Sequence, residues 1–147
     1  MSHQSISQDI TVTTCHVHSA IKRKMAEEKN YENRIKKFLK KEECWCLKYW
    51  AGGGFTRSGV PDLLICCNGH FIGAEVKGDD GRPSALQIRE LKKIQKAGGI
   101  GILLFPPDYI IFCDLIRYLK EGNLKLADQC IEELEYKVEE WRKKLNE

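Results

Sequence analysis

Two carboxylates and an amine, those of Asp62, Glu75 and Lys77, lie in one short segment whose turn should bring them together. In residues 59–77, GVPDLLICCNGHFIGAEVK, two apolar runs flank Asn68-Gly69. This dipeptide between apolar runs is typical of a two-residue type I′ β-hairpin. The turn sets a register in which Asp62 lies directly opposite Glu75. Lys77 follows two residues along the same strand and therefore shares their face.

Opposed carboxylates of this kind indicate a metal site. Like charges in directly opposed positions of antiparallel strands are destabilising unless something compensates them. A divalent cation does so, and carboxylate oxygens suit Mg²⁺, for which Mn²⁺ can substitute, better than zinc. Water bound to such an ion could attack a phosphodiester, with Lys77 as an electrostatic helper rather than the general base. With a register shifted by one residue, the segment would instead be a surface hairpin with a simple salt bridge.

These residues carry a resemblance to a nuclease superfamily. Pro61-Asp62 followed by Glu75-Val76-Lys77 is similar to the PD-(D/E)xK signature, and residues 31–113 as an ordered set resemble the VRR-NUC domain family, including its standalone, phage-type Holliday junction resolvases. The resemblance implies a restriction-endonuclease-like α/β core and metal-dependent hydrolysis of DNA. It implies a metal shell of Glu32, Asp62, Glu75 and the Val76 carbonyl, and a catalytic set of Glu32, Asp62, Glu75, Lys77 and Gln87.

The local sequence pattern also indicates where the side chains of Glu32 and Gln87 point. Glu32 stands three residues before Ile35 at the margin of an apolar helical stripe, so its carboxylate can point inward. The alternative is an ordinary exposed glutamate. Gln87 completes a capping box with Ser84 and also lies on the face that a helix over 84–97 would turn toward the sheet. The structural and functional interpretations of Gln87 are compatible.

Basic side chains are concentrated beside these motifs. The net charge is only +3, but residues 1–50 hold ten Lys and Arg against six Asp and Glu. Such an excess is typical of a groove that binds phosphates, although for any single lysine a solvated helix face is the simpler interpretation. We predict that DNA contacts Lys36, Lys40, Lys48, Arg57, Ser58 and Arg82.

Lys48 has two interpretations of its own. It lies in the alternating run 44–51, on the face of Cys44, Cys46 and Trp50. The family resemblance suggests a place near substrate phosphate, whereas an edge-strand lysine would serve to block unwanted strand pairing. The glycine-rich loop that follows, 52–59, lacks the Gly-Lys-Ser/Thr ending of a P-loop, so nucleotide hydrolysis has no support.

The remaining pattern predicts an α/β fold with a small mixed sheet flanked by helices. Strands are expected at 44–51, 63–67, 70–76, 100–105 and 109–113, and helices at 19–43, 84–97 and 124–145. We divide the chain into a flexible arm or extra edge strand at 1–18, a nuclease core at 19–121 and a C-terminal helix at 122–147. The apolar heptads of that last helix predict either a seam against the domain's own core or a dimer contact.

Length and composition bound the class of protein. The 147 residues suffice for one domain, no apolar run is long enough to span a bilayer, and seven cysteines without CxxC spacing favour a reduced compartment. We therefore expect a soluble cytoplasmic protein. The leading hypothesis is a structure-selective endonuclease for branched DNA, acting as a homodimer. The alternatives are restriction-type cleavage of duplex DNA and a catalytically inactive module for nucleic-acid binding or assembly.

Overall fold

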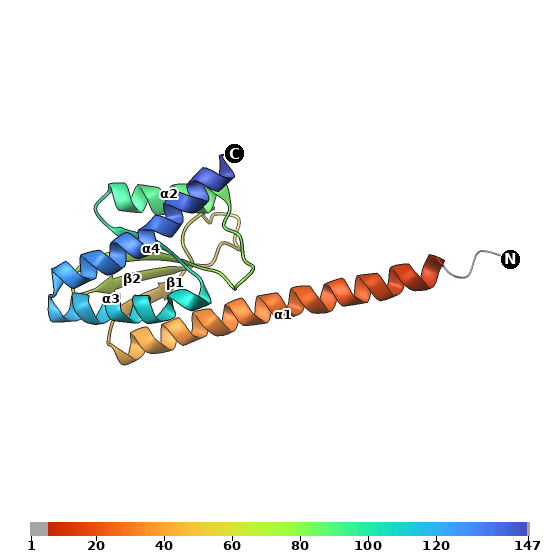
Figure 1. Cartoon of the computed structure of the whole chain (residues 1–147), viewed down its shortest axis with the longest axis horizontal. Helices are drawn as coiled ribbons and strands as arrows, with labels where there is room; N and C mark the ends of the chain where they lie inside the picture. The colour runs from red at the N-terminus through yellow and green to blue at the C-terminus, as the bar shows by residue number, and fades with distance from the viewer. Residues whose placement is uncertain (1–5, 147) are drawn as a thin grey trace.

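The computed structural model of the chain describes residues 6–146, with side chains from Thr14 onward. Helices flank a small sheet in an α/β arrangement (Figure 1). In chain order the elements are α1 (Ile6–Lys41), β1 (Trp45–Lys48), β2 (Leu63–Cys67), β3 (His70–Val76), α2 (Ala85–Lys96), β4 (Ile100–Leu104), the 3₁₀ helix η1 (Pro106–Asp108), α3 (Tyr109–Glu121) and α4 (Leu124–Leu145).

The sheet is mixed, as predicted. Its strand order is β1-β2-β3-β4, in which β1 pairs with β2 and β2 with β3 in antiparallel fashion, while β4 is parallel to β3. The hairpin between β2 and β3 pairs Cys67 with His70, which confirms the predicted register. Asn68 and Gly69 have φ angles of 48° and 80°, the positive values that a type I′ turn requires at both central residues.

One face of the sheet forms the main core with α1, α3 and the first part of α4. Every second residue of β2, β3 and β4 points into it, because side chains alternate between the faces of a strand. These strand residues are Leu63, Ile65, Cys67, Ile72, Ala74, Val76, Ile100, Ile102 and Leu104. The α1 residues predicted to face the core, Tyr31, Ile35, Phe38 and Leu39, are all buried there.

The opposite face carries Glu75 and is covered by α2. Two glycines let this helix lie close to the strands. A Cβ atom added to Gly73 would stand 2.4 Å from the Ile94 Cδ1 atom, and one added to Gly101 would stand 2.3 Å from the Leu91 carbonyl oxygen. The close approach brings the first turn of α2 against the end of β3, where Glu75 lies.

Helix α4 belongs to the core of this domain. Its seam residues Ala127, Leu134 and Val138 are fully buried, and the helix packs against α3, β4 and α2. Lys137 forms an ion pair with buried Asp108. Of the two predicted uses of the heptads, packing within the chain is therefore the one that the structure displays.

The N-terminal segment differs from its prediction. Residues 6–18 are the beginning of α1, so an extra edge strand there is wrong, while residues 1–5 lie outside the described part of the chain. The first half of α1 extends away from the rest of the domain (Figure 1). Alternation at ITVTT favoured a strand, but this short run lies within a continuous helix of 36 residues.

The predicted strand at 109–113 is also wrong, because YIIFC opens helix α3. A short apolar run does not distinguish a strand from a buried helical turn. The helical spacing becomes clear only when Phe112 is taken together with the later residues Leu115, Ile116 and Leu119, all of which are buried. Pro106 and Pro107, which lie between the predicted strands 100–105 and 109–113, belong to the 3₁₀ turn that leads into the helix.

Among the described residues, no helix combines the length and apolar character needed to cross a membrane.

Candidate active site

Asp62 is held at the end of β1 by its backbone and at the end of β3 by its side chain. It directly precedes β2, and its carbonyl oxygen accepts a hydrogen bond from the Tyr49 N–H at 2.9 Å. Its Oδ2 atom accepts a second one from the Val76 N–H at 3.0 Å. The hairpin register, continued by one pair beyond Leu63 and Ala74, sets Asp62 opposite Glu75. The pairing of carboxylates that the turn predicts is thus present.

Glu75 is a buried carboxylate with only one of its oxygens satisfied. The residue is 2% exposed, and its Oε1 atom accepts from Gln87 Nε2 at 2.5 Å and lies 3.1 Å from Lys77 Nζ. Its Oε2 atom is buried and has no hydrogen-bond partner. Burial, followed by the charge of Asp62, raises the pKa of Glu75 to about 7, with Lys77 opposing the shift.

Gln87 forms the predicted cap of α2 and also contacts Glu75. The side-chain Oε1 atom of Gln87 accepts from the backbone N–H of Ser84 at 2.8 Å. The backbone N–H of Gln87 donates to Ser84 Oγ at 3.2 Å, which completes the capping box of α2. The amide nitrogen of the same side chain then reaches Glu75. The cap therefore also orients a donor toward the buried acid.

Glu32 points inward from α1, with a side chain only 12% exposed, but it meets a lysine there. Lys48 Nζ lies 2.7 Å from Glu32 Oε2 and 3.2 Å from Asp62 Oδ1. Lys36 lies on the other side of Glu32, at 3.5 Å. Lys48 thus connects the helical glutamate to the hairpin aspartate, a role that sequence reasoning missed. Its alternating position beside Trp50 was the available signal.

The predicted metal ligands are only partly brought together. Within residues 6–146, no group of three or more His, Cys, Asp and Glu side chains is arranged to hold a metal ion. Asp62 and Glu75 nevertheless oppose each other beside the Val76 backbone, and the free Glu75 Oε2 is an orphaned buried acceptor that a cation would satisfy. Glu32 is not assembled with them directly, because Lys48 lies between it and Asp62.

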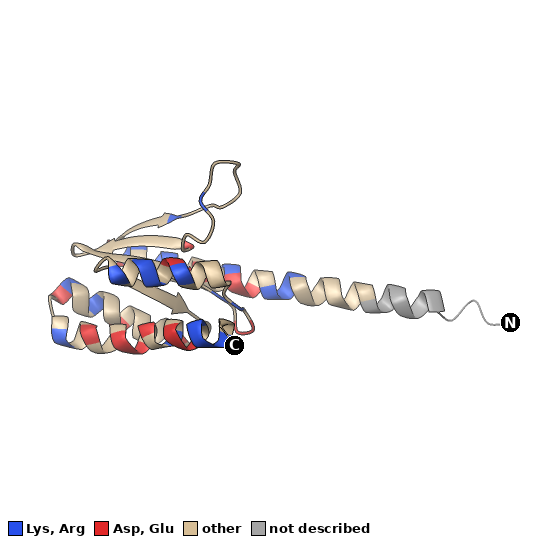
Figure 2. Ribbon diagram, turned by 90° about the horizontal axis from the view of Figure 1, so that it is seen from above, with Lys and Arg blue, Asp and Glu red and all other residues tan. Residues whose placement is uncertain are grey.

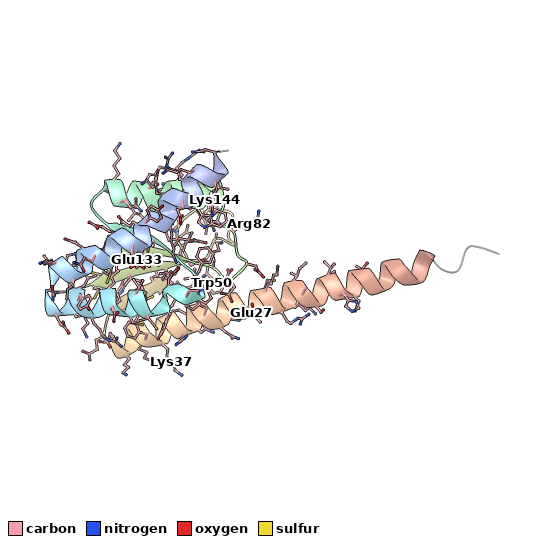
Figure 3. The ribbon with its side chains drawn as sticks, viewed as in Figure 1. Glu27, Lys37, Trp50, Arg82, Glu133 and Lys144 are labelled. Carbon is pink, nitrogen blue, oxygen red and sulfur yellow. The ribbon has the colours of Figure 1, made fainter. Side chains whose placement is uncertain are left out.

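The candidate DNA-contacting residues divide into two groups. Lys36 and Lys48 line a groove of about 600 Å³ between α1, Trp50 and the loop at 78–81. Lys40 is exposed one turn beyond Lys36 on the same helix. The groove also contains Glu27, Glu28, Asp79 and Asp80, so its charge is mixed rather than uniformly basic. Figure 3 labels Trp50 and Glu27 where α1 leaves the domain.

The second group lies beyond the groove. Arg57 and Ser58 are exposed in the loop 49–62, which projects from the end of the sheet (Figure 2). Arg57 is tied to α2 by an ion pair with Glu90 at 2.7 Å. Arg82 is exposed in the segment before α2. These residues are accessible to a ligand, and the ion pair of Arg57 is made with Glu90 rather than with Asp62 or Glu75.

Comparison with known proteins adds no relative, since no protein-family model, curated protein or solved structure matches the chain significantly.

Proposed function

We propose that this chain is a metal-dependent endodeoxyribonuclease of the VRR-NUC type within the PD-(D/E)xK superfamily. The observation that carries the proposal is the buried, unpartnered Oε2 atom of Glu75 opposite Asp62 and next to Lys77. A carboxylate kept in such a place is costly unless it serves a ligand. The motif residues lie at the same end of the sheet as Glu32, which precedes them in the chain, and Gln87, which follows them. This arrangement supports the roles proposed for these residues.

The proposed chemistry is hydrolysis of a DNA phosphodiester. Asp62, Glu75 and the Val76 carbonyl would hold Mg²⁺ or Mn²⁺, which when bound acidifies water and neutralises phosphate charge. Lys77, held at Glu75, would stabilise the negative charge that develops at phosphorus. Gln87 orients Glu75 by its hydrogen bond and leaves Oε2 free. Glu32 would act through Lys48, which it holds beside Asp62.

We also propose that the protein is cytoplasmic. The family resemblance favours branched DNA as its substrate. Paired cuts across a four-way junction require two active sites and therefore a homodimer. Since the seam of α4 is buried within the chain, such a dimer would use another surface.

The proposal is tested by cleavage of labelled four-way junction, flap, single strand and linear duplex in parallel. Each substrate is incubated with Mg²⁺, Mn²⁺ or EDTA, and Lys77→Ala serves as the control. We expect metal-dependent cutting of the junction that Lys77→Ala loses. Cutting of only one duplex sequence would favour the restriction-type alternative, and no metal-dependent cutting of any substrate would contradict the proposal.

A second candidate, an inactive nucleic-acid-binding module, is favoured by one observation. The Lys48 ammonium bridges Glu32 and Asp62 and so neutralises them without a metal. If it replaces the cation, Mg²⁺ will leave the melting temperature of the wild type unchanged and raise that of Lys48→Ala. If the site is a working metal centre, Mg²⁺ will raise the melting temperature of the wild type.

A further inference from the structure

Two aromatic side chains are exposed in the loop beside the candidate active site. Trp50 is 74% exposed and Phe55 is fully exposed, both in the loop 49–62. The loop projects from the end of the sheet that carries Asp62 (Figure 2). Indole and phenyl rings left in water to this extent mark a surface that another molecule covers.

The Trp50 ring is connected to the carboxylates by a single side chain. Lys48 Nζ stands 5.4 Å from the centre of that ring and 3.2 Å from Asp62 Oδ1. Trp50 also lines the groove that contains Lys36 and Glu32. A group lying on the ring would therefore lie next to Lys48 and close to Asp62.

The base of the loop is held in place, so the ring has a defined position. The Tyr49 N–H donates to the Asp62 carbonyl, and the Tyr49 hydroxyl accepts from the Arg57 N–H at 2.8 Å. Arg57 is in turn ion-paired with Glu90 of α2. Trp50 follows directly after the residue that closes the loop, ahead of the flexible Gly52-Gly53-Gly54.

We propose that Trp50 is a stacking platform for an unpaired base next to the scissile phosphate. The inference rests on the proposed nuclease function and narrows its substrate class to DNA with unpaired nucleotides at the cleavage point. Bases within a continuous duplex have both faces covered by neighbours, whereas an unpaired base offers a face to an aromatic ring. The ammonium groups of Lys48 and Lys36, both paired with Glu32, lie in the same groove as the ring, and phosphates on either side of the base would compete with Glu32 for them.

The test uses a duplex with a short gap that contains one unpaired 2-aminopurine, and the same duplex without a gap. Binding and 2-aminopurine fluorescence are measured in EDTA, so that no cleavage occurs. The proteins are the wild type, Trp50→Ala, Trp50→Phe and the control Tyr136→Ala, which removes an exposed ring from α4. Because Trp50 is largely exposed, its substitution should leave the fold intact, and Trp50→Phe retains a ring if Trp50→Ala does not fold.

We expect the wild type to quench 2-aminopurine and to prefer the gapped duplex. Trp50→Ala should bind the gapped duplex about ten- to a hundredfold more weakly, as stacking on an aromatic ring predicts, and should lose the quenching. Trp50→Phe should keep part of both effects, and Tyr136→Ala should match the wild type. Unchanged binding and quenching by Trp50→Ala would overturn the inference.

A parallel cleavage assay with Mg²⁺ separates the two proposals. If the wild type and Trp50→Ala cut gapped and paired DNA at equal rates, the stacking inference fails while the nuclease function stands. If the wild type quenches 2-aminopurine but cuts nothing, the nuclease function fails and the stacking platform belongs to a binding site.

Discussion

Gln87 Nε2 donates a hydrogen bond to Glu75 Oε1 at 2.5 Å, while the other end of the same amide caps helix α2. One side chain therefore couples the start of a helix to the orientation of a buried acid. The free Oε2 of Glu75 is what remains available to a ligand, because Gln87 and Lys77 both engage Oε1.

Replacing Gln87 should affect both stability and cleavage. Gln87→Ala removes half of the capping box, at a cost of about 1 kcal/mol, and also removes the donor to Glu75. Ser84→Ala is the matched control, since it weakens the same cap and leaves the Glu75 contact in place. We expect similar losses of stability in urea unfolding but a larger loss of cleavage rate for Gln87→Ala. Equal cleavage rates for the two variants would show that the amide only caps the helix.

Asp62→Asn should abolish metal-dependent cleavage with little change in DNA binding. The substitution keeps an oxygen that can accept from the Val76 N–H but removes the charge proposed to bind the cation. A rate reduction of at least about a hundredfold is expected for loss of such an electrostatic group. Asp79→Asn, an exposed acid in the same groove, is the control and should cut normally. Full activity of Asp62→Asn would remove the proposed ligand.

Glu75 should make the metal-free protein less stable as pH rises. Its ordinary pKa of 4.5 applies to the unfolded chain, whereas burial and Asp62 raise the folded-state pKa to about 7. The folded state therefore binds this proton more tightly, and the resulting stability is complete below pH 4.5 and is lost as pH rises through 7.

The measurement is the melting temperature in EDTA across this pH range for the wild type and Glu75→Gln. We expect a steeper fall for the wild type, since the glutamine does not ionise, and the difference between the proteins cancels other titrating groups. Mg²⁺ should restore stability mainly above pH 7, where Glu75 is ionised. Parallel melting curves for the two proteins would contradict the assignment.

Leu134→Ala should destabilise the domain by about 2–5 kcal/mol, because it opens a cavity in a fully packed site. Leu124→Ala, at a position on the same helix that is 50% exposed, is the control and should cost much less. Urea unfolding and light scattering together distinguish core packing from an interface. A change in subunit number at unchanged stability would mean that the seam contacts a second chain.

Local sequence patterns correctly predicted the β2–β3 hairpin and helix α2, which together carry most of the candidate site. Asn68-Gly69 demands positive φ at both positions, so the register of Asp62 and Glu75 followed from neighbouring residues alone. The capping box at Ser84 and Gln87 was equally local. Segment 109–113 was predicted wrongly because five apolar residues are compatible with either a strand or a helix, and only its packing against α1 and α4 selects the helix.

The residues of the hairpin are sufficient to predict which acids face each other, because a two-residue turn propagates its register along both strands. The surroundings of these acids depend on tertiary packing. Lys48 meets Glu32 and Asp62 because α1 packs beside β1, and Gln87 meets Glu75 because α2 approaches the sheet over glycines. Contacts between residues distant in the chain depend on how whole elements pack, and no local spacing encodes that.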